Sequence, residues 1–520
     1  MSATFSTFTR KRPDRTVRSL VLGGYAALAE SAWMGFAQAT EMIDSLRPAP
    51  GFGQRAIVPR LPKVQWRNLL TREFTVAEAS FILMVSFFTS AMLGAVRQIL
   101  FNAQFGVGMA ANAYYAAFRL PDTLFSLIAG GALSSAMIPV LLNTVREEGE
   151  AAGARLIQLV LTTLLTFFAL LVLLVELFTP GLVQGVLAPG FDPATSQLTV
   201  TLTRMMLFQP LILAAASVAT AVLNSRNQFL LTGLSVISYN VALILSILAA
   251  RLVPSLGIYG PTLGVVLGAI FQVLILTPAF RTTGCPFRPA WSFANPRLRE
   301  IVALLIPNGL AVGVNYAGNI ADTSFASTAT ESAALGAIYN GWLLVGLPIA
   351  LLGQAVGQAA FPRLAAAAES GDWSGLRRSL LQALGAVLGL SLLAMAGLFF
   401  LGRPVITVLF ERGEFTAAAG DLTYQVLIAY ALALPAYVGT EVITRGLIAL
   451  RDTRTPLLTN LVQLTGRIAI MTLFVPPVGV IAIPAALAVT AALEAMTLGV
   501  VLFVKLQQRL AERAWEVITK

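Results

Sequence analysis

The stretch AYYAAFRLP at residues 113–121 returns in related form as AIYNGWLLVGLP at residues 337–348. The tyrosines Tyr114 and Tyr339 in these stretches are about 225 residues apart. Four further pairs keep nearly the same offset: Pro139 with Pro362, Phe191 with Phe415, Pro210 with Pro435, and LNSRN at 223–227 with IALRD at 448–452. Because several of these positions are polar or proline, the agreement favours an internal repeat over chance similarity between apolar segments.

The composition around this repeat indicates a membrane protein. The chain has 520 residues, of which 57% are hydrophobic and only 12% are charged, about half the ~25% charged share of soluble domains. Its mean hydropathy is +0.79. These values exclude a soluble globular enzyme and a disordered chain, and they predict many membrane-spanning segments.

From residue 78 onward the sequence shows twelve apolar segments, each expected to be a helix because lipid cannot satisfy an open backbone. They lie near 79–103, 111–142, 155–179, 198–223, 229–250, 258–280, 300–326, 333–361, 379–402, 421–449, 456–475 and 480–504. Six segments in each repeat is an even number, so both halves have the same orientation. The predicted fold is an all-α polytopic bundle of about twelve helices in two parallel six-helix lobes, a transporter architecture.

The basic residues of the loops predict the orientation. With the N-terminus in the cytoplasm, the inside loops and both termini carry 27 Lys and Arg, and the outside loops carry only Arg251, Arg403 and Arg412. Such an excess predicts that both termini are cytoplasmic. The predicted organisation is a basic cytoplasmic extension at 1–77, an N-lobe at 78–280, a cytoplasmic linker at 281–299, a C-lobe at 300–505 and a cytoplasmic tail at 506–520. In the extension, residues 17–40 fit an interfacial helix better than a span.

Several kinds of chemistry are excluded by residue type. The chain has no histidine and a single cysteine, Cys285, which excludes histidine-based catalysis, intrachain disulfides and cysteine metal clusters. No nucleotide-binding P-loop motif is present, so we expect no built-in ATPase and no cofactor. The net charge of +10 is explained by cytoplasmic loops, and we expect no nucleic-acid partner.

The stretch GAVRQILFNAQFGVGMAANAYYAAFRLPDTLFSLIAGGALSSAMIPVL at residues 94–141 resembles the first two helices of the MurJ/MviN lipid II flippases. That family belongs to the multidrug/oligosaccharidyl-lipid/polysaccharide transporter superfamily. Further matching landmarks are LNSRNQF at 223–229, VLFERGEFT at 408–416 and ALRDTRTPL at 449–457, and the resemblance covers about residues 78–505. It implies a MurJ/MATE-like fold with a V-shaped central cavity.

The resemblance also implies a function. The chain is expected to be a transporter and no enzyme, flipping a polyprenyl-diphosphate-linked glycan across the bacterial cytoplasmic membrane by alternating access. Lipid II, the peptidoglycan precursor, is the first candidate substrate. The implied partners are this lipid-linked glycan, membrane lipids and, as candidates, proteins of cell-wall synthesis.

Departures from the family pattern keep two alternatives open. Arg97 matches the second of two arginines usual in the first helix, whereas Ala91 occupies the first position, and Asn112 replaces a usual acidic residue. The run FSLIAGGA at 125–132 lacks two arginines and a glutamate that are usual there. The alternatives are an exporter of another lipid-linked oligosaccharide and a transport-inactive membrane scaffold of envelope synthesis.

Arg97 and Arg119 are the predicted contacts for the diphosphate of such a substrate. Arginine suits phosphate because its planar guanidinium donates two parallel hydrogen bonds, and a charge inside a span faces a cavity by default. We expect the two arginines to share one site, assisted by the neutral donors Asn112 and Tyr115. The alternative for either arginine is an interfacial position or a structural pairing.

A polar face in the seventh segment is the predicted site of ion coupling. Asn315, Asn319 and Asp322 recur at i, i+4 and i+7 and therefore share one helix face, which could hold Na⁺ or H⁺. The alternative is a cluster that only joins helices. Glu441 and Arg445 are expected to pair within one helix. Glu494 is alone in the twelfth segment, and Arg467 in the eleventh is its candidate partner.

Overall fold

The computed structural model describes residues 74–129, 132–278, 288–292 and 294–519, and the regular elements in these ranges are helices. The first half contains α3 (Val76–Phe105), α4 (Met109–Ala129), α5 (Ala132–Glu148), α6 (Glu150–Leu182), α7 (Pro193–Met206), α8 (Phe208–Ser225), α9 (Phe229–Leu252) and α10 (Tyr259–Leu276). The second half contains α12 (Pro296–Thr328), α13 (Ala334–Pro348), α14 (Ala355–Glu369), α15 (Trp373–Leu409), α16 (Ala417–Ala449), α17 (Arg454–Val478) and α18 (Ala482–Thr519).

Local sequence signals explain where several of these helices begin. At the start of α3 the Thr75 hydroxyl accepts from the Glu78 backbone N–H at 3.3 Å, and the Glu78 carboxylate accepts from the Thr75 N–H at 2.9 Å, a reciprocal cap. Asp192 caps α7, and a proline follows it at the first helical position. Asn295 caps α12 in the same way. Such a cap satisfies N–H groups that have no partner inside the helix.

Helices cover all twelve predicted segments, and some segments are divided. The second segment comprises α4 and α5, the fourth comprises α7 and α8, and the eighth comprises α13 and α14 joined by a π-helical turn at Ile349–Gln354. Among the described residues, ten helices are long and apolar enough to cross a membrane. The described residues of the segments at 111–142 and 300–326 are helical, but these segments fall outside those ten. The predicted interfacial helix at 17–40 lies outside the described residues.

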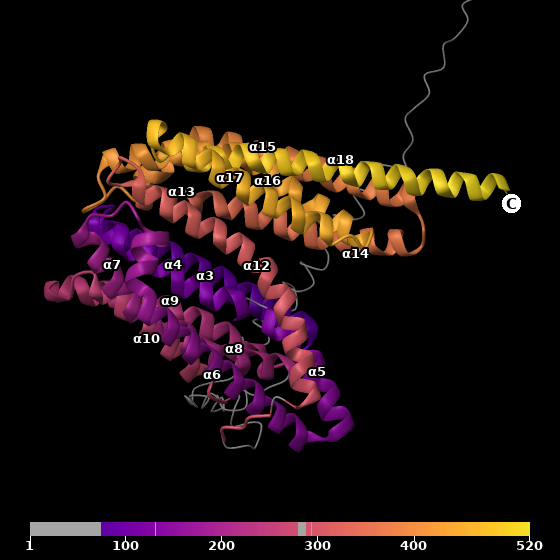
Figure 1. Ribbon diagram of the computed structural model, residues 1–520, viewed down its shortest axis with the longest axis horizontal. Coiled ribbons are helices and arrows are strands. Elements are labelled where there is room, and N and C mark those ends of the chain that lie inside the picture. The colour runs from indigo at the N-terminus through magenta and orange to yellow at the C-terminus, as the bar shows by residue number, and fades with distance from the viewer. Residues whose placement is uncertain (1–73, 130–131, 279–287, 293, 520) are drawn as a thin grey trace, which may run out of the picture. The chain divides into compact units, whose positions relative to one another are not determined.

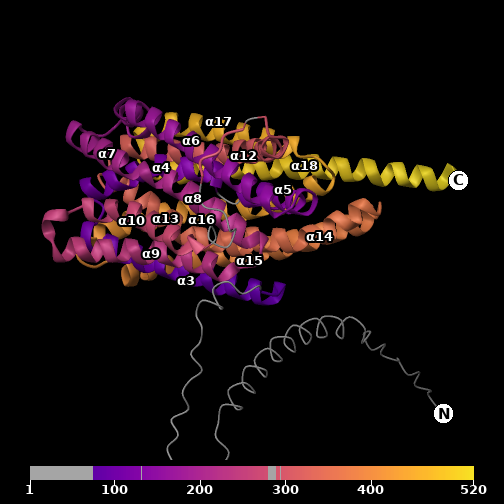
Figure 2. The same ribbon diagram turned by 90° about the horizontal axis from the view of Figure 1, so that it is seen from below.

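The helices pack mainly within their own half of the chain (Figure 1; Figure 2). In the first half, α9 packs against α3 and α10, and α8 packs against α5, α6 and α10. In the second half, α16 packs against α13, α15 and α18. The main contacts between the halves are made by α12 and α13 with α4, α5 and α6. A site that needs residues from both halves must therefore lie beside these helices.

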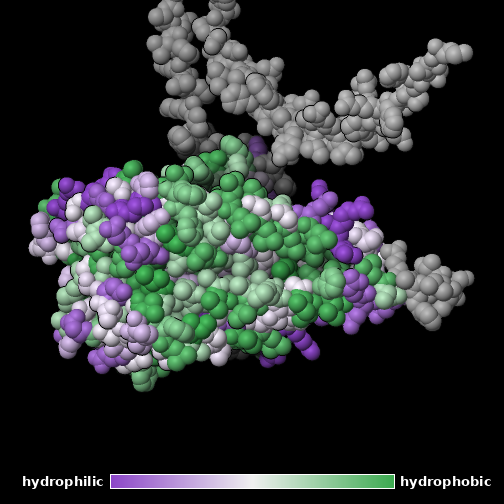
Figure 3. All heavy atoms as spheres, turned by 90° about the horizontal axis from the view of Figure 1, so that it is seen from above, coloured by the Kyte–Doolittle hydropathy of each residue, from purple (hydrophilic) through white to green (hydrophobic). Residues whose placement is uncertain are grey.

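The surface of residues 74–519 explains the high hydropathy. Figure 3 shows hydrophobic residues across the middle of one face and hydrophilic residues gathered towards its two ends. Large apolar side chains are exposed on α3 and α15, among them Phe81, Phe88, Leu393 and Phe400. Exposure of so much apolar surface is stable only against lipid. The protein is therefore a multi-pass membrane protein.

Candidate functional site

Arg97 is held on α3 by a neutral partner from α9. Its Nη1 donates to Oδ1 of Asn240 at 3.3 Å, and Nδ2 of Asn240 donates to the Ser90 hydroxyl at 2.8 Å. The Arg97 side chain borders a cavity of about 20 Å³ whose wall includes the rings of Tyr114 and Tyr339. No carboxylate within the described residues forms an ion pair with Arg97. No direct ion pair within the described residues therefore neutralises its positive charge.

Arg119 connects α4 to the second half of the chain. Its Nε donates to the Thr323 hydroxyl on α12 at 3.0 Å, and that hydroxyl donates in turn to the Asn319 carbonyl oxygen at 2.9 Å. The guanidinium carbon lies 5.9 Å from the centroid of the Tyr339 ring on α13. A cation in this position is attracted by the negative face of the ring. Arg119, like Arg97, has neutral partners.

The two predicted arginines have common neighbours. Tyr339 borders the cavity of Arg97 and lies beneath the guanidinium of Arg119. Asp122, one turn after Arg119 on α4, interacts electrostatically with both arginines. They therefore face the same region between the halves. Sequence reasoning missed Asp122, although an acidic residue in an apolar segment three positions after an arginine was a visible signal.

The other two predicted substrate contacts have structural partners. Nδ2 of Asn112 donates to the Ser332 carbonyl oxygen at 2.5 Å, which joins α4 to the turn before α13. The Tyr115 ring stacks on Tyr339 with the centroids 4.5 Å apart, and its hydroxyl donates to Oδ1 of Asn102 at 3.1 Å. Tyr115 borders the cavity of Arg97 through its ring. Both residues are buried, so their contribution to a substrate site stays a prediction.

A buried amide cluster, formed by Gln98, Asn102, Tyr115 and Asn340, joins α3 and α4 to α13. Nε2 of Gln98 lies 2.7 Å from the Tyr115 hydroxyl and 2.9 Å from Oδ1 of Asn340. Nδ2 of Asn102 donates to the same Asn340 oxygen at 2.9 Å. Nδ2 of Asn340 also donates to the Gly336 carbonyl oxygen at 2.9 Å. Buried polar groups that satisfy one another across the contact hold the two halves at a defined distance. The sequence pattern did not predict this cluster.

The two halves also meet through backbone contacts at the end of the bundle that carries the α3–α4 turn, called here the α3–α4 end. The backbone N–H of Glu414, in the loop between α15 and α16, donates to the Ala103 carbonyl oxygen at 3.0 Å. Gly413 and Gly106 have φ values of 61° and 59°. A Cβ at Gly413 would overlap the Ala103 oxygen, and one at Gly106 would overlap the Glu414 carbonyl. Only glycine permits this approach.

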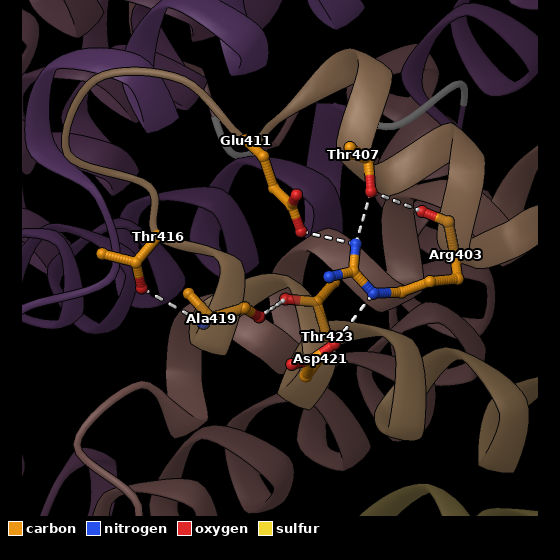
Figure 4. Close-up of polar contacts among 7 residues, drawn as sticks. All are labelled: Arg403, Thr407, Glu411, Thr416, Ala419, Asp421 and Thr423. Carbon is orange, nitrogen blue, oxygen red and sulfur yellow. Dashed lines mark hydrogen bonds and ion pairs between the residues drawn. The ribbon is translucent and has the colours of Figure 1, made fainter.

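Arg403 anchors the loop that makes this contact (Figure 4). Its guanidinium bonds to Glu411 at 2.5 Å and to Asp421 at 2.8 Å, so it joins the end of α15, the loop and the start of α16. The Thr416 hydroxyl accepts from the Ala419 N–H at 3.3 Å and caps α16. A second contact at the same end joins the Gly190 N–H to the Ser327 hydroxyl at 3.1 Å. The α3–α4 end is therefore closed.

The predicted ion-coupling face has a protein cation beside it. Asp322 on α12 forms an ion pair with Arg467 on α17, and both residues are buried, with 5% and 7% of their surface exposed. Asn319 borders a polar cavity, and the side chain of Asn315 lies outside the described ones. The ion-coupling role itself stays a prediction.

Among the remaining charged residues of the spans, one expected pair is found and one is wrong. Nη2 of Arg445 lies 3.9 Å from Oε2 of Glu441, which confirms their pairing within α16. Arg467, however, pairs with Asp322 rather than with Glu494, whose carboxylate instead lies 3.4 Å from the Thr459 hydroxyl. Arg467 can meet Asp322 because α12 packs against α17, a tertiary contact between residues 145 positions apart.

Comparisons with known proteins agree with this architecture. A family model described as lipid II flippase MurJ matches residues 101–520. A probable lipid II flippase MurJ of Rhizobium meliloti is 29% identical over 375 residues, which cover 71% of this chain and 70% of the relative. The lipid II flippase MurJ of Burkholderia cenocepacia is 28% identical over 391 residues, covering 72% of this chain and 74% of the relative.

Two solved structures share the fold. A lipid II flippase MurJ in an inward closed conformation gives a TM-score of 0.69 at 22% identity, covering 85% of this chain and 93% of its own. An inward-facing multidrug resistance MATE family transporter gives 0.68 at 12% identity, covering 83% of this chain and 99% of its own. At these identities the likeness establishes the fold alone, and it confirms the predicted MurJ/MATE-like class.

Proposed function

Because the chain belongs to the lipid II flippase MurJ family, we propose that it flips lipid II across the bacterial cytoplasmic membrane by alternating access. The family is one of transporters rather than catalysts. The observation that carries the proposal is the placement of Arg97 and Arg119 around Tyr339, between the two halves of the chain. A lipid-linked diphosphate is anionic, and an uncompensated ion in a low-dielectric cavity costs several kcal/mol even after relaxation.

The two arginines supply that compensation in the proposal. Each is held by a neutral group, Asn240 or Thr323, so neither loses a carboxylate partner when the diphosphate arrives. Asp122 lies within electrostatic reach of both and partly balances their charge while the site is empty. The diphosphate takes over this balancing role when it binds. The guanidinium geometry favours phosphate over a single point charge.

Alternating access requires that one end opens when the other closes. We assign the closed α3–α4 end to the external side, with both termini in the cytoplasm, because the basic loops lie at the opposite end. In this assignment Gly106 and Gly413 form part of an external seal, and the Arg403 cluster sets the shape of its loop. Separation of Glu414 from Ala103 then begins external opening.

We propose that ion coupling, if it operates through α12, uses the Asp322–Arg467 pair as a two-state element. Asp322 would exchange Arg467 for Na⁺ or H⁺ as the halves move. In this proposal the Asp322–Arg467 pair corresponds to the state without a bound ion. Either charge alone is strongly disfavoured in a dry interior, so in this proposal Asp322 leaves Arg467 only when Na⁺ or H⁺ replaces it.

One observation supports the second candidate function, export of another lipid-linked oligosaccharide. Phe125 and Ser126 occupy positions where the family resemblance implies arginines, so this site has fewer cations. A substrate whose phosphate groups make fewer contacts with the protein would need fewer cations in the site. A transport-inactive scaffold would have no need of two cations with neutral partners between the halves.

Complementation tests the proposal directly. The chain is expressed in a strain depleted of its own lipid II flippase, with a known lipid II flippase as the positive control. We expect growth with the natural chain and none with Arg97→Ala at equal membrane expression. Failure of the natural chain, with the control growing, would contradict lipid II transport and favour the second candidate. Growth with Arg97→Ala would remove Arg97 from the substrate site.

A further inference from the structure

A second polar cavity lies within the C-terminal half, separate from the cavity of Arg97. It measures about 360 Å³ and lies between α12, α16, α17 and α18. It extends from the α16–α17 turn, at the end opposite the α3–α4 end, to the middle of α17. Its polar lining includes Asn319, Glu441, Gln463, Arg467 and Glu494. A water molecule needs only about 10–15 Å³ of such space, so this cavity admits an organic group.

No cation among the described residues lies within hydrogen-bonding distance of either carboxylate of this cavity. Glu494 accepts one bond, from the Thr459 hydroxyl at 3.4 Å, and it makes no ion pair among the described residues. Glu441 has Arg445 at 3.9 Å, which is longer than the 2.7–2.9 Å of a charge-assisted hydrogen bond. The two glutamates also interact with each other electrostatically, and like charges repel. Both carboxylates would be stabilised by a cation placed between them.

Arg467 adds the opposite charge to the lining of the same cavity. Only 7% of its surface is exposed, and its Nη2 pairs with Asp322. Its Nε has no hydrogen-bond partner within the described part of the chain. A buried donor without a partner is costly, at about 1–3 kcal/mol, and an acceptor supplied by a ligand would satisfy it. The cavity thus presents acceptors for a cation and an unsatisfied donor for an anion.

We infer that this cavity binds the peptide portion of the transported lipid, with its ammonium group on Glu441 and Glu494 and a carboxylate on Arg467. The inference rests on the proposed function, because it concerns the substrate of the same transporter. It assigns the diphosphate to Arg97 and Arg119 and the zwitterionic peptide to the C-terminal half. A lipid carrying only neutral sugars would leave Glu494 without a cation and Glu441 with Arg445 alone, at 3.9 Å.

A metal ion fits this lining less well than a primary ammonium. The described residues contain no group of three or more acidic, cysteine or histidine side chains that could hold a metal. An ammonium has three N–H donors, which suit two carboxylates and a neighbouring amide oxygen. The amides of Asn319 and Gln463 supply such oxygens. Gln463 already donates through Nε2 to the Thr490 hydroxyl at 3.2 Å, which leaves its oxygen as an acceptor.

The test compares two substrates that differ only in the ammonium group. Purified protein in liposomes is given lipid II with a free peptide side-chain amine, or the same lipid II with that amine acetylated. We expect the natural chain to flip the free amine about tenfold faster or more, since a hydrogen bond to a charged group is lost on acetylation. In the double variant Glu441→Gln, Glu494→Gln, the two substrates should be transported at equal rates, so the preference is lost.

Glu176→Gln is the matched control, because Glu176 pairs with Arg204 at 3.3 Å outside the cavity. It should keep the full preference, and size-exclusion profiles should show that all variants are folded. Equal transport of both substrates by the natural chain would overturn the inference. So would a preference that survives in the double variant. An equal, sodium-dependent loss for both substrates in that variant would also overturn it, and would make the cavity an ion site.

Failure of the proposed function would give a different result. In that case the natural chain flips neither substrate, while a known flippase in parallel liposomes flips both. The affinity of detergent-solubilised protein for the two lipids then tests peptide binding in the cavity independently of transport. Tighter binding of the free amine, lost in the double variant, supports it, and equal affinities overturn it.

Discussion

Arg97 and Arg467 are both arginines inside apolar helices, yet their surroundings differ in one decisive respect. Arg97 is held by the neutral amide of Asn240, whereas Arg467 is held by the carboxylate of Asp322. The first arrangement leaves a net positive charge beside the contact between the halves. The second neutralises its charge within the protein. The identity of the partner, rather than the presence of a charge in a span, decides whether an arginine keeps a net charge or is neutralised within the protein.

The largest expected effect concerns the ion pair between Arg467 and Asp322. Arg467→Ala leaves Asp322 as a buried charge without its partner and should destabilise the fold by about 3–5 kcal/mol. The double variant Asp322→Leu, Arg467→Leu should recover most of that loss, because it removes both charges. Thermal unfolding of purified protein measures both effects. A fully stable Arg467→Ala would show that the pair contributes little.

The next effect tests the available charge on Arg97. Arg97→Ala should lower lipid II transport by about a hundredfold, as expected when a charged contact worth ~3 kcal/mol is lost. Arg97→Lys should retain part of the activity, because it keeps the charge and loses the planar fork. Thermal unfolding should change little in either variant. Natural activity in Arg97→Ala at equal expression would contradict the contact with phosphate.

A double-mutant cycle asks whether Arg97 and Arg119 act together. The two should couple in substrate binding by more than the ~0.5 kcal/mol typical of independent sites. The measured quantity is the affinity for lipid II of the natural chain, the two single alanine variants and the double variant. Strict additivity, or normal binding in Arg119→Ala, would show that the two arginines do not share a site.

The smallest expected effect concerns the neutral partner that holds Arg97. Asn240→Leu removes the 3.3 Å hydrogen bond and should lower transport about threefold to tenfold, corresponding to a net loss of about 0.5–1.5 kcal/mol. The charge of Arg97 remains, so activity should stay well above that of Arg97→Ala. Initial flipping rates in liposomes measure the difference. Equal rates in the two variants would mean that Asn240 is as necessary as the arginine itself.

Much of the architecture could be predicted because its signals are local or periodic. The apolar segments, the internal repeat and the landmarks around Arg97 predicted an all-helical bundle of this class. The pairing of Glu441 with Arg445 was also predictable, since residues four apart share a helix face. The spacing of Asp122 from Arg119 could have identified it as a candidate. Its electrostatic contact with Arg97 could not have been predicted, because the two residues lie on different helices.

The sequence by itself determined which segments are helical, because hydropathy and residue spacing act within a single helix. Only the tertiary structure decided which charge meets which partner. Arg467 pairs with Asp322 across 145 positions, and Asn340 joins Gln98 across 242. The closed α3–α4 end likewise depends on Gly413 meeting Ala103 in another part of the chain. The physical reason is that a buried polar group takes whichever partner helix packing brings within about 3 Å, and sequence separation does not limit that choice.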